Sequence, residues 1–201
     1  PEPVFTPHDY RRRILKPMYE DIAPHDPKKV VQHEWLNSRG AIARFMRDTI
    51  EIRLIDVQES PQSDLAIAAA TIALIRALVE ARFLNCTRQK EFTSETLRDI
   101  LLATIRDAER TVIDDQQYLR TFGIRELKCT AAELWSHILE AIADRPDGFN
   151  EHIAVLRSLI ARGCLARRIV RSLDGKEDAD SIRRAYRRLA GCLRNAEMFE
   201  A

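Results

Sequence analysis

Residues 49–56 read TIEIRLID, and residues 64–69 read DLAIAA. The first stretch alternates charged and apolar side chains, which is the pattern of a β-strand. The second opens a run that is apolar on nearly every side, as in a buried helix. Residues 41–46 (AIARFM) are also strand-like. We therefore predict a β-hairpin that turns at residues 47 and 48, followed by a long helix.

The hairpin places three charged side chains together. With Arg47 and Asp48 as a two-residue turn, Arg44 pairs with Glu51, and alternation puts Arg53 on the same face. A carboxylate between two guanidinium groups has two interpretations. It is either a structural ion pair worth up to about 1 kcal/mol, or a catalytic surface. In the second case the carboxylate binds Mg²⁺ and the arginines bind phosphate or carboxylate oxygens.

The rest of the chain is predicted to be helical. Thr6 and Thr130 are N-cap candidates, and Thr130 with Glu133 forms a capping box. Pro17 is expected to kink or end the first helix. The fold class is therefore α+β and predominantly helical, with a β-hairpin from an antiparallel sheet followed by a C-terminal helical bundle. The predicted helices cover approximately residues 7–22, 27–31, 63–83, 94–108, 131–142, 149–170 and 178–193.

Composition narrows the class of protein. The 201 residues carry 32 Lys and Arg against 31 Asp and Glu, and this near-neutral balance argues against a dedicated nucleic-acid binder. The longest uncharged run, residues 65–75, is shorter than the roughly 18–20 residues that span a bilayer. We therefore expect no nucleic-acid and no membrane partner. The cysteines show no metal or disulfide spacing, which favours reduced thiols and a cytoplasmic location. They are Cys86, Cys129, Cys164 and Cys192.

Several other charged residues have two interpretations each. His33 and Glu34 can be a metal or acid–base pair, although a packed or capping pair is the commoner outcome, and Trp35 is expected in the core. Asp56 and Glu59 can extend a metal site or serve as turn and cap residues.

The last helix carries a stripe of arginines, which predicts a solvated face or, alternatively, a contact with an anion or RNA. The stripe consists of Arg183, Arg184, Arg187 and Arg188.

The strand at 49–56 and the helix at 64–69 together resemble the late sheet strand and following helix of the glutamine synthetase superfamily. More narrowly, residues 33–45 (HEWLNSRGAIARF) and 55–61 (IDVQESP) resemble the bacterial carboxylate–amine ligases of the glutamate–cysteine ligase type 2 family. Shorter similarities continue to the end of the chain. These are YLR at 118–120, TAAELW at 130–135, GCLARR at 163–168 and EMF at 197–199.

The resemblance implies a fold, an activity and a set of site residues. It implies an ATP- and Mg²⁺-dependent ligase that joins glutamate to an amine such as cysteine through an acyl phosphate. In this resemblance Glu51 is the Mg²⁺ ligand. Arg53 and Arg44 are the catalytic residues, which stabilise charge on the transferring phosphoryl group or the bound amino acid. Arg39, from the Ser-Arg-Gly loop, joins Arg44 and Arg53 as a candidate for ATP binding.

The resemblance covers the C-terminal half of such ligases. We therefore expect residues 1–60 to belong to a larger sheet and residues 61–201 to form the helical region, as one continuous unit of a longer protein. The N-terminal half of that protein is then an expected partner, a homo-oligomer is possible, and the isolated chain is expected to be inactive. The alternative is a non-catalytic helical interaction or regulatory domain. It is favoured by Met46, which stands where the family often has an acidic residue.

Overall fold

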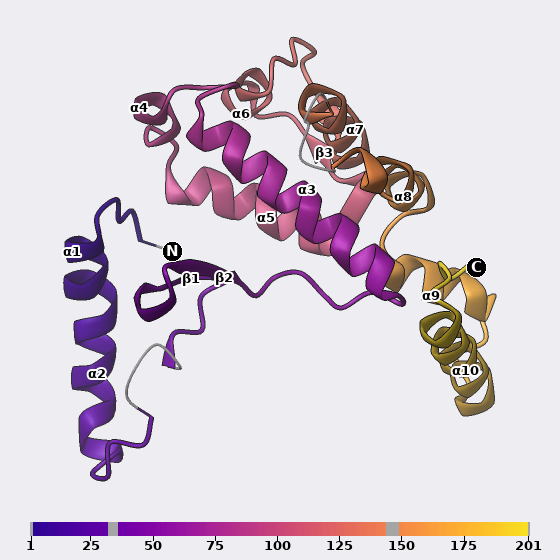
Figure 1. Ribbon diagram of the computed structural model, residues 1–201, viewed down its shortest axis with the longest axis horizontal. Coiled ribbons are helices and arrows are strands. Elements are labelled where there is room, and N and C mark those ends of the chain that lie inside the picture. The colour runs from indigo at the N-terminus through magenta and orange to yellow at the C-terminus, as the bar shows by residue number, and fades with distance from the viewer. Residues whose placement is uncertain (1, 32–35, 144–148, 201) are drawn as a thin grey trace. The chain divides into compact units, whose positions relative to one another are not determined.

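The computed structural model describes residues 2–31, 36–143 and 149–200 (Figure 1). The chain divides into two compact units, Pro1–Asp56 and Val57–Ala201. Helices predominate, with short antiparallel strands between them, so the predicted α+β, mainly helical class is confirmed. The interpretations given to His33, Glu34 and Trp35 lie outside the described residues.

The first unit opens with one long helical segment. Thr6 caps it by accepting a hydrogen bond from the Asp9 N–H at 3.0 Å, as predicted. Pro17 was expected to kink or end this segment, but the helix continues past it. The preceding turn is a wider π-helix, in which Lys16 N–H bonds to the carbonyl of Arg11, and this turn accommodates the proline. The elements are α1 (Pro7–Tyr10), η1 (Arg11–Leu15), α2 (Lys16–Ile22) and η2 (Ala23–His25).

The short helix predicted at residues 27–31 is wrong. The Asp26 carboxylate accepts hydrogen bonds from the backbone N–H groups of Val30 and Val31, at 2.8 and 2.9 Å. These bonds hold the segment as a loop, because they give the backbone an alternative to helical pairing.

The hairpin forms, but its register differs from the prediction. Strands β1 (Ala41–Arg44) and β2 (Thr49–Ile52) are joined by the short helix η4 (Phe45–Arg47) and by Asp48, which adopts a left-handed conformation at φ +48°. Arg44 consequently pairs with Thr49 and not with Glu51. A slip of two residues leaves every side chain on its original face, so Arg44 and Glu51 still share a surface.

The second unit is built around helix α3, whose alanine face packs against α8 and α7. The capping box of Thr130 and Glu133 at the start of α7 is present as predicted. A second pair of strands, β3 and β4, was not predicted. The elements of this unit are α3 (Pro61–Val79), α4 (Cys86–Gln89), α5 (Ser94–Asp107), η5 (Ala108–Arg110), β3 (Val112–Ile113), α6 (Gln116–Thr121), β4 (Cys129–Thr130), α7 (Ala131–Ile142), α8 (Asn150–Arg162), α9 (Leu165–Leu173) and α10 (Ala179–Asn195).

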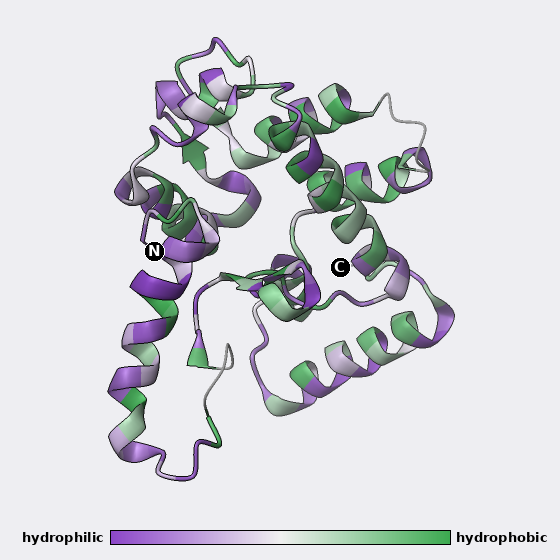
Figure 2. Ribbon diagram, turned by 60° about the vertical axis from the view of Figure 1, so that its left-hand side comes forward, coloured by the Kyte–Doolittle hydropathy of each residue, from purple (hydrophilic) through white to green (hydrophobic). Residues whose placement is uncertain are grey.

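Helix α3 has two different apolar faces. Ala66, Ala70 and Ala77 are buried, whereas the larger Leu65 and Ile72 are exposed. Within the described residues, α3 is the helix that is long and apolar enough to cross a membrane, a property that it shares with core helices of soluble proteins. Other helices alternate hydrophobic and hydrophilic residues along their length, as Figure 2 shows. On α10 the predicted arginine stripe is solvent-exposed.

The single helix predicted at 149–170 is two helices. Gly163 separates α8 from α9 and has a φ of +82°, which ends the first helix. The arginine that follows in α9, Arg168, is buried in the interior with 1% exposed surface.

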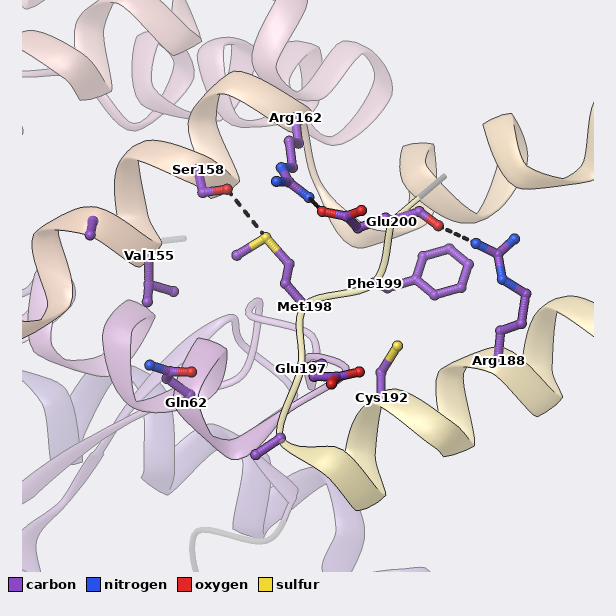
Figure 3. A pocket seen from close by; sticks show the side chains of 12 residues that line it. Gln62, Val155, Ser158, Arg162, Arg188, Cys192, Glu197, Met198, Phe199 and Glu200 are labelled. Atoms are coloured by element: carbon purple, nitrogen blue, oxygen red, sulfur yellow. Dashed lines mark hydrogen bonds and ion pairs between the residues drawn. The ribbon is translucent and has the colours of Figure 1, made fainter.

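The C-terminal tail is fastened to the start of α3 and to α9. Arg168 donates to both oxygens of Glu59, at 2.5 and 3.2 Å, and to the carbonyl of Phe199 at 3.1 Å. Glu59 also accepts from the Phe199 N–H at 2.9 Å. A cavity of about 700 Å³ adjoins this network. Among the residues that line it, Arg162 and Arg188 both donate hydrogen bonds to Glu200 (Figure 3). This buried network locks residue 199 in place.

Candidate functional site

The predicted charged cluster is present on the hairpin. Arg44 Nη1 lies 2.7 Å from one carboxylate oxygen of Glu51, and Arg53 Nε lies 2.7 Å from the other. The Arg44 side chain is buried at 8% exposure, whereas those of Glu51 and Arg53 are 39% and 28% exposed. The cluster therefore combines a buried guanidinium group with a carboxylate that solvent can reach.

The local sequence explains this arrangement. Glu51 and Arg53 are two residues apart in an extended segment, so both side chains lie on one face. The Arg53 N–H bonds to the carbonyl of Gly40 at 2.8 Å, which continues the ladder one step beyond β2. A Cβ atom at position 40 would lie 2.4 Å from the Leu54 side chain, so a larger residue there would require this side chain to move.

The electrostatic environment keeps Glu51 ionised. The hydrogen bond from Arg53 is the main cause that lowers the pKa of Glu51 below its ordinary value. The positive charges of Arg53 and Arg44 act in the same direction, and desolvation opposes them. An ionised carboxylate between two guanidinium groups fits both interpretations given by the sequence, the structural ion pair and the surface that binds anions and a cation.

Arg39 is paired with a different carboxylate from the one that Arg44 and Arg53 share. Its guanidinium group pairs with the carboxylate of Glu2, with Nε at 2.8 Å, and Nη1 contacts the sulfur of Met18 at 3.6 Å. The pairing raises the pKa of Arg39 and lowers that of Glu2. The structure therefore brings Arg44, Glu51 and Arg53 together and gives Arg39 a different partner.

Two residues that the sequence did not single out complete the cluster. Asn37 is fully buried, and its carbonyl accepts from Arg53 Nη1 at 2.6 Å. The Asn37 amide donates to the hydroxyl of Tyr10 at 2.7 Å. No periodicity marks Asn37, because it lies in an irregular loop, and no charge or motif marks Tyr10 as a site residue.

The oxygen atoms of this cluster can be compared with the ligands that Mg²⁺ prefers. A carboxylate offers about four lone-pair positions, and the two arginines occupy one on each oxygen of Glu51. Among the described residues, no group of three or more His, Cys, Asp or Glu side chains could hold a metal. Glu51 thus fits Mg²⁺ as one ligand beside phosphate oxygens and water, which is the usual way this ion is bound.

Glu59 does not extend such a site. Its side chain is completely inaccessible, and both of its oxygens are used by Arg168. The alternative that placed Glu59 at a metal is therefore wrong, because its position is set by an ion-pair partner 109 residues away.

Comparison with known proteins identifies the family. A model of glutamate-cysteine ligase family 2 matches residues 1–188. The chain belongs to this family. The predicted resemblance is thereby confirmed, and it makes the chain a ligase-like family member.

A relative of this glutamate-cysteine ligase family 2 chain is found in Archaeoglobus fulgidus, where it is described as an uncharacterized protein. It is 28% identical over 201 residues, which are 99% of this chain and 46% of the relative. The chain thus spans about half the length of the curated relative that it matches. No solved structure matches the chain.

Proposed function

We propose that the chain is part of an ATP- and Mg²⁺-dependent carboxylate–amine ligase, which forms a γ-glutamyl amide from glutamate and an amine such as cysteine. The observation that carries this proposal is the solvent-accessible Glu51 carboxylate held between Arg44 and Arg53. Membership of glutamate-cysteine ligase family 2 supports the reaction class. The substrates, including the choice of amine, are part of the proposal.

The proposed reaction has two steps. A carboxylate oxygen of glutamate attacks the γ-phosphorus of ATP, the bond to ADP breaks, and an acyl phosphate forms. The amine nitrogen then attacks the acyl carbon, phosphate leaves, and the nitrogen loses its proton. Both reactants of the first step are anions, so positive charge must be in place before they approach each other.

The arginines supply that charge. Arg53 is partly exposed and presents its guanidinium group beside Glu51, where it can bind the transferring phosphoryl group or the substrate carboxylate. Arg44 is buried and keeps the Glu51 carboxylate in a fixed direction. Arg39 can bind a second anionic group once it exchanges its present partner, Glu2.

Glu51 would hold the magnesium ion. When bound, this ion neutralises phosphate charge and positions the ATP oxygens. Glu51 contributes a carboxylate whose low pKa keeps it charged throughout the neutral range.

A second candidate is an interaction or regulatory domain that keeps the family fold without its chemistry. Met46 favours it, because this residue is 91% exposed at the tip of the hairpin, where the family often has an acidic residue.

Substitution of Glu51 by Gln separates the two candidates. We expect Glu51→Gln in the full-length protein to lower ligase turnover by about 100-fold or more, because the amide removes the charge that binds the cation. Turnover is measured as ADP and γ-glutamyl product formed from ATP, Mg²⁺, glutamate and cysteine. Glu20→Gln is the matched control, since Glu20 is an exposed partner of Lys16. A Glu51→Gln protein with the activity of this control would refute the ligase proposal.

A further inference from the structure

Asn37 is a fully buried polar residue that has no role in the reaction proposed above. Its backbone carbonyl accepts a hydrogen bond from Arg53 Nη1 at 2.6 Å. Its side-chain oxygen accepts from the backbone N–H and from Nη1 of Arg39, both at 3.3 Å. One loop residue therefore contacts two of the three arginines assigned to the site.

Tyr10 fixes the direction of the Asn37 amide. The Tyr10 hydroxyl accepts from Asn37 Nδ2 at 2.7 Å and from the backbone N–H of Ala43 at 3.3 Å. Its ring packs edge-on against Phe45, with 5.5 Å between ring centroids. Because Ala43 directly precedes Arg44, the hydroxyl ties the Asn37 loop to the strand that carries the third arginine.

This network restricts the conformational freedom of the arginine side chains. An arginine side chain has several rotatable bonds, and charge placed in advance stabilises a transition state better than charge that must first be ordered. A buried acceptor can fix such groups before substrate arrives. We propose that Asn37 is a positioning residue, oriented by Tyr10, which holds the Arg53 guanidinium group in place beside Glu51 and the Arg39 guanidinium group in place beside Glu2. Its effect on turnover rests on the proposed function.

Three variants test the role. Asn37→Leu removes both polar atoms of the side chain and keeps its branched shape and its number of heavy atoms. Asn37→Asp keeps the oxygen that Arg39 uses, and the Tyr10 hydroxyl can turn to donate its proton to the new carboxylate. Tyr10→Phe removes only the hydroxyl and keeps the ring. Tyr186→Phe is the matched control, since Tyr186 is 60% exposed on α10.

The first measurement needs no substrate. Nitrogen-15 NMR of the full-length protein follows the Nη–H signals of Arg39 and Arg53, which donate to Asn37, and their exchange with water. We expect Asn37→Leu and Tyr10→Phe to speed this exchange about tenfold or more, whereas Asn37→Asp and the control leave it unchanged. If Asn37→Leu does not fold, the same exchange measurement on Tyr10→Phe decides the outcome.

The second measurement is turnover. We expect Asn37→Leu to lower kcat by about 10- to 100-fold with the KM for ATP within about threefold of wild type, because misplaced groups fail mainly in the transition state. Asn37→Asp should restore kcat to within about threefold of wild type. A purely structural role would lower the unfolding temperature without this split between kcat and KM.

The outcomes separate the two proposals. Arginine signals unchanged in both Asn37→Leu and Tyr10→Phe would overturn the positioning role, and so would an Asn37→Asp protein as impaired as Asn37→Leu. A wild-type protein that shows Asn37-dependent arginine order but no ligase turnover would refute the proposed function and leave the positioning role standing.

Discussion

Replacement of Arg168 by Met should destabilise the protein more than almost any other single change to a charged residue. Arg168 is 1% exposed and donates to Glu59, to the carbonyl of Phe199 and to that of Gly163. Methionine fills much of the same space but donates nothing. The Glu59 carboxylate then remains buried, with the Phe199 N–H at 2.9 Å as a remaining donor.

The expected cost follows from this burial. Removal of one partner of a buried ion pair costs about 3–5 kcal/mol, because the other charge stays in a poorly solvating interior. For a chain of this length, that corresponds to a fall in Tm of roughly 6–20 °C. The double variant Glu59→Leu, Arg168→Met removes both charges and should be more stable than Arg168→Met alone.

Urea unfolding at pH 7, followed by circular dichroism, measures these differences. Arg183→Met is the matched control, because Arg183 pairs with Asp180 on the surface, where both side chains are more than half exposed. Its cost should stay below about 1 kcal/mol. An Arg168→Met protein as stable as this control, or a double variant less stable than Arg168→Met, would refute the reasoning.

Two further predictions concern the same unit. Burial by itself raises the pKa of Glu59, but the hydrogen bonds from Arg168 and Phe199 outweigh it and hold this pKa below the ordinary value of 4.5. The stabilisation is therefore present above about pH 4.5 and is lost as the pH falls through the lowered pKa. Unfolding free energies between pH 7 and 3 should decline more steeply for wild type than for Glu59→Gln, and equal slopes would contradict this. Ala70→Leu should cost about 1–3 kcal/mol by overpacking the contact of α3 with α8, whereas Ala68→Leu on the exposed side should cost much less. Thermal unfolding checks both variants, and equal Tm values would contradict the packing argument.

Local signals in the sequence predicted local structure well. The capping box at Thr130 and Glu133 requires only neighbouring residues, and it is present. Asp178 caps α10 for the same reason, by accepting from two backbone N–H groups. The shared face of Arg44 and Glu51 was also predictable, because it depends only on the period of a strand.

Features that depend on turns or distant partners were not predictable. The hairpin register was missed because Asp48, a residue with a Cβ atom, takes the left-handed conformation usually reserved for glycine. The break at Gly163 was missed because apolar residues continue on both sides of it. The burial of Glu59 depends on Arg168, whose charge pattern resembles that of an exposed helical residue.

The π-turn at Arg11–Leu15 sets the helical phase of the residues on either side of it. In an uninterrupted α-helix, Tyr10 and Met18 would point about 80° apart around the axis. One extra residue in a wide turn reduces this offset to roughly 20°. Tyr10 and Met18 can thus contact Asn37 and Arg39 from the same side of the helix. Deletion of one residue from the repeated arginines at 11–13 would rotate one of these contacts away, although the composition of the segment would hardly change.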